Sequence, residues 1–214
     1  MAPVLDNDVF TTTEAAVILG MAGTSPAGMI TKRAVDGVID KRLFPAAVVK
    51  RRLHGRALTS IGLKMVAAEF TLRRELPVVS MRKQVYAKLL QSHAALGCIP
   101  AGSAVLVDLD PQLRQVTDAL VRYRHLMAEI EIDPKVQRGE PVLRGTRVTV
   151  HTIAEIAEQG TSTEEILRHY PTITAEQVEA ARFFAKAHPR RGRPPLPDTG
   201  KVVVRMSIDD LKAL

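Results

Sequence analysis

Basic residues gather in one stretch near the N-terminus, and their type and spacing indicate contact with phosphate groups. Between positions 32 and 56 the sequence has eight lysines and arginines against two acids, Asp36 and Asp40. Lysine and arginine neutralise backbone phosphates in protein–DNA complexes. The candidate DNA-binding residues are Lys32, Arg33, Lys50, Arg51, Arg52 and Arg56. The alternative interpretation is a solvated basic face on an ordinary helical domain.

A second candidate for chemistry is the carboxylate pair Asp108 and Asp110, which follows an apolar run. Carboxylates at strand ends can hold Mg²⁺ in a nuclease, since hard cations take oxygen ligands. The favoured alternative is a strand-to-helix loop in which Asp110 is an N-cap. The six histidines show no metal-ligand spacing, and the sequence has neither a Ser-His-Asp set nor a Gly-rich phosphate loop. We therefore expect no catalytic residue, metal site or cofactor, and no enzymatic activity.

The elements that would position the basic residues are two short helices near the N-terminus. Thr12 or Thr13 can cap a first helix, which Gly20 closes. Ser25 is the expected N-cap of a second helix that runs to about residue 35, with Pro26 at its first position. A Gly-containing turn would join the two helices, as in a helix-turn-helix.

A wing is expected to follow the second helix, whose outer side carries Lys32 and Arg33. Residues 48–49 and 56–58 are typical of its two strands, and another helix should begin after Thr59. This order resembles the N-terminal domain of MerR-type regulators. The resemblance implies a winged helix-turn-helix DNA-binding domain over residues 1–75, with its second helix in the major groove.

Residues 76–128 are expected to form a helical connector. It should contain a helix over 80–93 and a strand within 102–110. A long helix should then run from Asp110 to about Met127, because apolar residues recur there at helical spacing. This helix is also a candidate dimer face.

Residues 129–188 read as a complete small module. The run P-V-L-R-G-T-R-V-T-V, from Pro141 to Val150, predicts a tight hairpin in which Gly145 takes a positive φ. Three helices should follow, the first stopping at Gly160. Capping boxes are expected at Ser162 with Glu165 and at Thr174 with Gln177, and Ile173 with Val178 should staple the entry to the last helix.

This module resembles the family catalogued as domain-of-unknown-function 433. The resemblance rests on Asp133-Pro134, Gly139, Pro141, Arg144-Gly145-Thr146-Arg147, Val150, Gly160, Tyr170-Pro171 and Thr174. Arg138 stands where a small residue is usual in the family, and Glu140 where a lysine is common. The resemblance implies a VapB-type antitoxin of a type II toxin–antitoxin system, whose partner is a PIN-type ribonuclease toxin.

The C-terminal tail, residues 189–214, admits two interpretations. Arg191 and Arg193 lie in an Arg-Gly-Arg-Pro match to the AT-hook, which enters the minor groove of A·T-rich DNA. The favoured interpretation is a stiff Pro/Arg-rich linker before a short strand and helix that bind a protein partner. The candidate partner-binding residues are Val202, Val203, Val204, Met206 and Leu211.

Composition limits the class of protein. The chain of 214 residues carries a formal net charge of +7, which favours an anionic partner. One cysteine excludes an internal disulfide framework, and no apolar run is long enough to span a membrane. We expect a cytoplasmic protein without membrane contact.

The sequence therefore predicts a mainly α fold with small β-hairpins (α+β). It comprises a winged helix-turn-helix domain followed by a hairpin-plus-three-helix domain. The expected function is an antitoxin, a homodimer in its simplest form, that neutralises its toxin by direct binding and represses its own operon by binding operator DNA. The alternatives are a DNA-binding transcription regulator without a toxin partner and, remotely, a metal-dependent nuclease.

Overall fold

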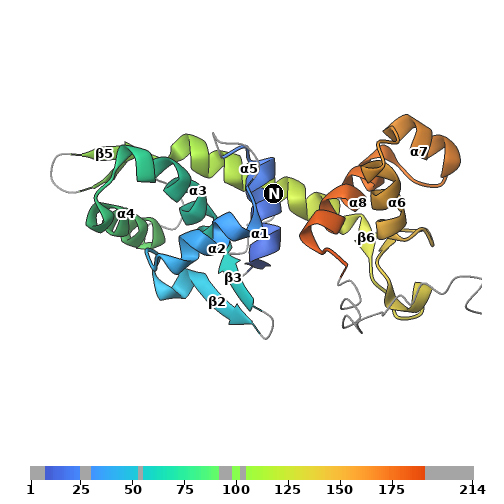
Figure 1. The fold of residues 1–214 in the computed structure, drawn as a ribbon, viewed down its shortest axis with the longest axis horizontal. Coiled ribbons are helices and arrows are strands. Elements are labelled where there is room, and N and C mark those ends of the chain that lie inside the picture. The colour runs from blue at the N-terminus through green and yellow to red at the C-terminus, as the bar shows by residue number, and fades with distance from the viewer. Residues whose placement is uncertain (1–7, 25–29, 53–54, 92–97, 102–104, 191–214) are drawn as a thin grey trace, which may run out of the picture.

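The computed structural model describes residues 8–24, 30–52, 55–91, 98–101 and 105–190. It is mostly helical with small antiparallel sheets, which confirms the expected α+β class (Figure 1). The long helix α5 (Asp110–Ala128) runs between two groups of helices, α1–α4 on one side and α6–α8 on the other.

The N-terminal sheet has three strands in the order β1-β3-β2. They are β1 (Val9–Thr11), β2 (Val49–Arg52) and β3 (Gly55–Thr59). The hairpin β2–β3 confirms the two strands expected for the wing, and β1 adds an edge strand that the sequence did not predict. A 3-10 turn (Ala46–Val48) leads into β2.

The first helix, α1 (Thr12–Met21), begins one residue earlier than expected. Its N-cap is Thr11, so the prediction of Thr12 or Thr13 was wrong. Thr11 Oγ1 accepts from Glu14 N at 3.2 Å and Glu14 Oε2 accepts from Thr11 N at 2.7 Å, which forms a reciprocal capping box. The cap at Thr11 therefore fixes where β1 ends and α1 begins.

The second helix, α2 (Lys32–Asp40), begins later than predicted. Its N-cap is Thr31, whose hydroxyl accepts from Ala34 N at 3.2 Å. The predicted caps, Ser25 and Pro26, lie outside the described residues, and Ile30 is buried ahead of the helix. The shift places Lys32 and Arg33 in the first turn of α2, still exposed as expected.

The middle of the chain adds two helices and a small sheet. α3 (Ser60–Glu75) and α4 (Val79–Gln91) flank Pro77. β4 (Cys98–Pro100), which the sequence did not predict, pairs with β5 (Leu106–Asp108). The start of α5 at Asp110 confirms the prediction for that helix.

Gly62 on α3 lies where a side chain would collide with the N-terminal sheet. A Cβ there would meet Val48 O at 2.9 Å and Leu58 Cδ2 at 3.1 Å. Gly37 on α2 is the matched control, because a Cβ there would meet nothing within 4 Å. We expect Gly62→Ala to lower the free energy of unfolding by about 1–3 kcal/mol through overpacking, and Gly37→Ala to raise it by about 0.5–1 kcal/mol. Urea denaturation would measure both, and equal effects would contradict the close packing of α3 on β3.

The C-terminal module has a short sheet and three helices. β6 (Ile130–Glu131) pairs with β7 (Val142–Leu143). The helices are α6 (Val150–Glu158), α7 (Thr163–His169) and α8 (Ala175–Ala187). Thr174 and Gln177 form the predicted capping box of α8, and the predicted staple residues Ile173 and Val178 are both buried in the module core. Ser162 caps α7 by accepting from Glu165 N at 3.2 Å.

The predicted hairpin over residues 141–150 is only partly formed. Val142 and Thr149 make an isolated bridge, while the ladder partner of β7 is β6. Val150 was expected in a strand, but it is the first residue of α6 because the Thr149 side chain caps that helix. Gly145 has a φ of 71°, as predicted for the turn.

The two halves of the chain pack against each other through α8, which lies on α1 and α5. Ala187 is 3% exposed and belongs to the N-terminal core rather than to that of its own module. His188 Nε2 lies 3.5 Å from Glu14 Oε1, and Arg122 on α5 pairs with Glu179. The half-buried Met127 packs against both cores.

None of the helices in the described part of the chain is long and apolar enough to cross a lipid bilayer. The exposed side of α5, the candidate dimer face, is polar apart from Val121, which is 53% exposed, and the terminal residues Pro111 and Ala128.

Candidate nucleic-acid interface

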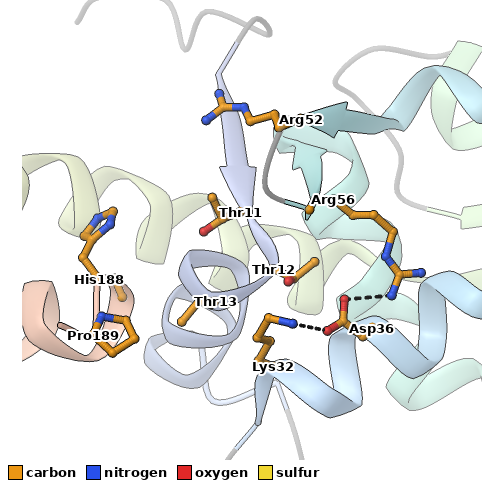
Figure 2. A pocket seen from close by; sticks show the side chains of 11 residues that line it. Thr11, Thr12, Thr13, Lys32, Asp36, Arg52, Arg56, His188 and Pro189 are labelled. Carbon is orange, nitrogen blue, oxygen red and sulfur yellow. Dashed lines mark hydrogen bonds and ion pairs between the residues drawn. The ribbon is translucent and has the colours of Figure 1, made fainter. Parts of the chain in front are cut away.

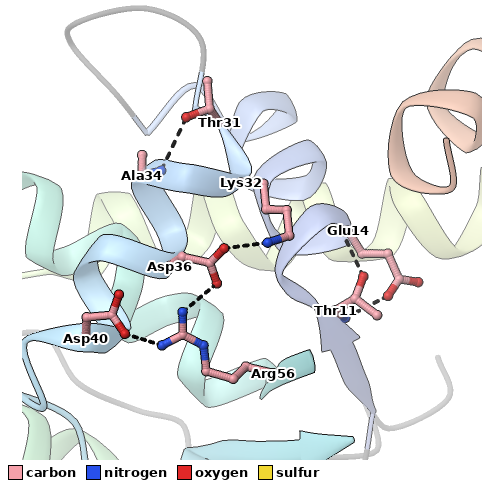
Figure 3. A network of polar contacts seen from close by, with 8 residues as sticks. All are labelled: Thr11, Glu14, Thr31, Lys32, Ala34, Asp36, Asp40 and Arg56. Atoms are coloured by element: carbon pink, nitrogen blue, oxygen red, sulfur yellow. Dashed lines mark hydrogen bonds and ion pairs between the residues drawn. The ribbon is translucent and has the colours of Figure 1, made fainter. Parts of the chain in front are cut away.

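Helix α2 and the β2–β3 hairpin are joined by one arginine. Arg56 on β3 donates from Nη2 to Asp36 Oδ1 at 2.9 Å and from Nη1 to Asp40 Oδ1, and both acids lie on α2 (Figure 3). Lys32 Nζ contacts the other oxygen of Asp36 at 2.6 Å. The hydrogen bond to Asp40, together with the charges of both acids, raises the pKa of Arg56. Arg56 therefore fixes the hairpin against α2.

Three other candidate cations are free. Arg33 on α2 and Lys50 and Arg51 on β2 are exposed, and their side chains make no ion pair or hydrogen bond with any described residue. Arg51 lies directly opposite Arg56 in the ladder.

A groove of about 940 Å³ opens beside this unit (Figure 2). On one side lies the N-terminal end of α1, with Thr11, Thr12 and Thr13. Lys32 and Arg52 line it as well, and Arg52 also donates to Val9 O at 3.3 Å. The end of α8 closes it with Ala187, His188 and Pro189. Lys32, Arg52 and the positive end of the α1 dipole favour an anion in this space, while Asp36 and the C-terminal end of α8 oppose it.

The structure brings the six predicted DNA-binding residues together on α2, β2 and β3, and it separates them by role. Arg33, Lys50 and Arg51 are free to reach a ligand, Arg52 is exposed with one backbone contact, and Lys32 and Arg56 are paired. The sequence reasoning missed Asp36 and Asp40 as partners of Arg56. Their i, i+4 spacing on one helix face was the available signal.

The carboxylate pair of the nuclease hypothesis is engaged within the chain. Asp108 Oδ1 accepts from Asp110 N at 2.9 Å, and Asp110 Oδ2 pairs with Arg114 Nη2 at 2.7 Å. Asp110 is the first residue of α5 and its N-cap is Leu109, so the predicted capping role of Asp110 was wrong. The described residues contain no group of three or more His, Cys, Asp or Glu side chains that could hold a metal ion.

The predicted tail sites lie outside the described residues. They are Arg191, Arg193, Val202, Val203, Val204, Met206 and Leu211. Arg190, the last described residue, pairs through Nη2 with Glu140 Oε2 at 3.4 Å and through Nη1 with Glu155 Oε1 at 3.5 Å.

Comparison with known proteins finds similarity at two levels. The chain is 27% identical over 190 residues to the uncharacterized protein y4eO of Sinorhizobium fredii (strain NBRC 101917 / NGR234), an alignment that covers 83% of this chain and 85% of that protein. No solved structure matches the chain. Residues 130–185, which span β6 to α8, match the model of the family described as "Protein of unknown function (DUF433)".

Proposed function

We propose that the N-terminal domain binds duplex DNA as a winged helix-turn-helix, with α2 in the major groove and the β2–β3 hairpin against the phosphate backbone. One observation carries this proposal: α2 and the hairpin are fixed to each other by Arg56 and present the unpaired cations Arg33, Lys50 and Arg51. The order α1, α2, β2–β3, α3 is the order expected from the MerR-like resemblance and supports the proposal, while β1 is an addition to that pattern. Unpaired cations on a fixed frame suit phosphate contacts, because little side-chain pairing is lost on binding.

The experiment compares two triple variants of equal charge in fluorescence anisotropy with a labelled duplex taken from upstream of the coding sequence. The test variant is Arg33→Ala/Lys50→Ala/Arg51→Ala. The control variant is Arg73→Ala/Arg74→Ala/Lys83→Ala, on exposed positions of α3 and α4. We expect the test variant to bind about 100-fold more weakly at physiological salt, since each lost phosphate contact forfeits the release of a counterion. Equal affinity of the test variant and the wild type would refute the proposed interface.

A second function, that of an antitoxin, is proposed from the match of residues 130–185 to the DUF433 family. In this role the protein neutralises a PIN-type ribonuclease toxin and represses its own operon through the DNA-binding domain. The alternative is a transcription regulator without a toxin partner. A toxin gene adjacent to the gene of this protein would favour the antitoxin over the regulator. Co-expression with the neighbouring gene product should give a co-purifying complex and relieve toxicity. Deletion of residues 201–214 should abolish neutralisation or dimerisation while leaving DNA affinity nearly intact.

A further inference from the structure

Charge in the C-terminal module is segregated. Residues 135–147 contain four basic residues and one acid, Glu140. Six of the nine acids between positions 131 and 188 lie instead on α6, α7 and α8. The net acidic charge of the module therefore conceals a cationic surface, which we define as Lys135, Arg138, Arg144 and Arg147.

The four side chains of this cationic surface are exposed, and none makes an ion pair or hydrogen bond with a described residue. Glu140 is paired with Arg190, and Asp133 Oδ1 accepts from the backbone N of Lys135 at 2.8 Å. Arg190 therefore lies beside Glu140 in the same loop region. Glu131 and Asp133 thus lie close to the cations in the sequence, but no described carboxylate pairs with their side chains.

The backbone holds the cationic surface in a defined shape. Gln137 Nε2 donates to Arg147 O at 3.4 Å, which joins the 3-10 turn (Gln137–Gly139) to the turn after β7. Gln177 on α8 donates to Arg144 O at 3.1 Å, and Arg144 N donates to Glu129 O at 2.8 Å. These bonds preorganise the cations, which reduces the ordering cost of binding.

Arg138 occupies a backbone conformation that glycine would adopt at lower cost. Its φ is 60°, and that of the preceding Gln137 is 46°. Non-glycine residues are held in this left-handed region chiefly where surrounding structure or function requires them. The fold therefore holds Arg138 in a costly backbone conformation while its side chain stays exposed and free to reach a ligand.

The chemistry of the surface favours phosphate over a protein partner. Protein interfaces rely on buried aromatic or large apolar anchors. Among the residues from 133 to 147, Pro134 is the one exposed apolar side chain, and the preceding Ile132 is 62% exposed. Arginines on a fixed frame, in a segment without an aromatic anchor, match the phosphate contacts of nucleic acid.

We propose that the cationic surface is a second phosphate-binding site, which contacts DNA flanking the segment bound by α2 and the β2–β3 hairpin. This inference rests on the proposed DNA binding of the N-terminal domain. In Figure 1 the hairpin and the segment after β6 both lie toward the lower edge of the view, with α5 between the two halves.

The test uses two mixed-sequence labelled duplexes, one of about 12 and one of about 36 base pairs, with salt titrations of each. The variant is Arg138→Ala/Arg147→Ala, and the matched control is Arg168→Ala/Lys186→Ala on exposed positions of α7 and α8. On the long duplex the variant should bind about tenfold more weakly and lose about two units of log–log salt slope. On the short duplex the variant and the wild type should bind equally.

A second variant, Arg138→Gly/Arg147→Ala, excludes a folding artefact, because glycine adopts the left-handed backbone conformation at no cost. It should bind the long duplex as weakly as the first variant. Wild-type affinity of both variants on the long duplex would overturn the inference while leaving the α2–hairpin interface intact. The same is true if the losses on the short and long duplexes are equal. If the wild type binds neither duplex, the second site and the proposed function both fail. A loss confined to binding of the co-expressed neighbouring gene product would assign the surface to a protein and overturn the inference.

Discussion

Replacing Glu69 by alanine is expected to lower the free energy of unfolding by about 3–5 kcal/mol, because it strands a buried guanidinium. Glu69 on α3 is fully buried, and its Oε2 accepts from Arg82 Nε at 3.1 Å and from Tyr86 Oη at 2.7 Å. Arg82 on α4 is itself 6% exposed and also donates to the carbonyl oxygens of Leu76 and Pro77. Burial, reinforced by Glu69, raises the pKa of Tyr86.

Urea denaturation followed by circular dichroism would measure this effect. Asp110→Ala is the control, because it removes an exposed ion pair with Arg114 and should cost about 0–1 kcal/mol. Glu69→Gln keeps an acceptor for Arg82 and Tyr86 and should fall between the two. A loss of less than about 1 kcal/mol in Glu69→Ala, equal to that of the control, would show that the network does not hold α3 to α4.

Replacing Ala187 by glutamate is expected to destabilise the protein by about 3 kcal/mol, since it forces a charged side chain into a packed position. Ala187 is 3% exposed and packed with the N-terminal core, next in sequence to His188, which lies 3.5 Å from Glu14. The new side chain would have to displace packed apolar neighbours before its carboxylate reached the cations of the adjacent groove, and it would add a second negative charge near the cap of α1. We therefore expect the contact between α8 and α1 to be lost, and the variant to unfold at a lower temperature than the wild type.

Lys186→Glu is the matched control, because Lys186 is the exposed neighbour on α8 and receives the same side chain. Differential scanning calorimetry would compare the two variants with the wild type. The control should unfold within about 1 kcal/mol of the wild type, because an acid in the last turn of α8 opposes the helix dipole only weakly at an exposed position. If Ala187→Glu behaves as its control does, the docking of α8 on α1 does not contribute to stability.

Local rules predicted those elements whose signals lie close together in the sequence. The capping box of α8, the turn at Gly145 and the start of α5 each depend on residues within a few positions of one another. The start of α2 was missed because Ser25 is followed by Pro26, a residue favoured at the first position of a helix, whereas Thr31 is followed by Lys32.

The remaining features are set by contacts between distant segments. β6 has two residues, too few for a detectable alternation, and it pairs with β7 across a long loop. Ala187 packs into the N-terminal core in the same cluster as Phe10, although the two residues lie more than 160 positions apart in the sequence. No periodicity within a single helix contains that information.

The sequence predicted which basic residues make up the candidate site, but not which of them are paired and which are free. The sequence placed the cations on α2 and the hairpin correctly, because basic residues concentrate there. It could not separate the free cations from the paired ones. That difference depends on which face of α2 meets Arg56, and so on the tertiary packing of Asp36 and Asp40.

The salt dependence of duplex binding tests the central claim most directly. The association constants of the wild type and of Arg33→Ala/Lys50→Ala/Arg51→Ala would be measured on one duplex over a range of salt concentrations. If these side chains contact phosphates, the log–log slope of the variant should be shallower by about 2.7, or 0.9 for each lost contact. The Arg73→Ala/Arg74→Ala/Lys83→Ala control should keep the wild-type slope. An unchanged slope in the test variant, or an equal change in the control, would contradict DNA binding by α2 and the hairpin.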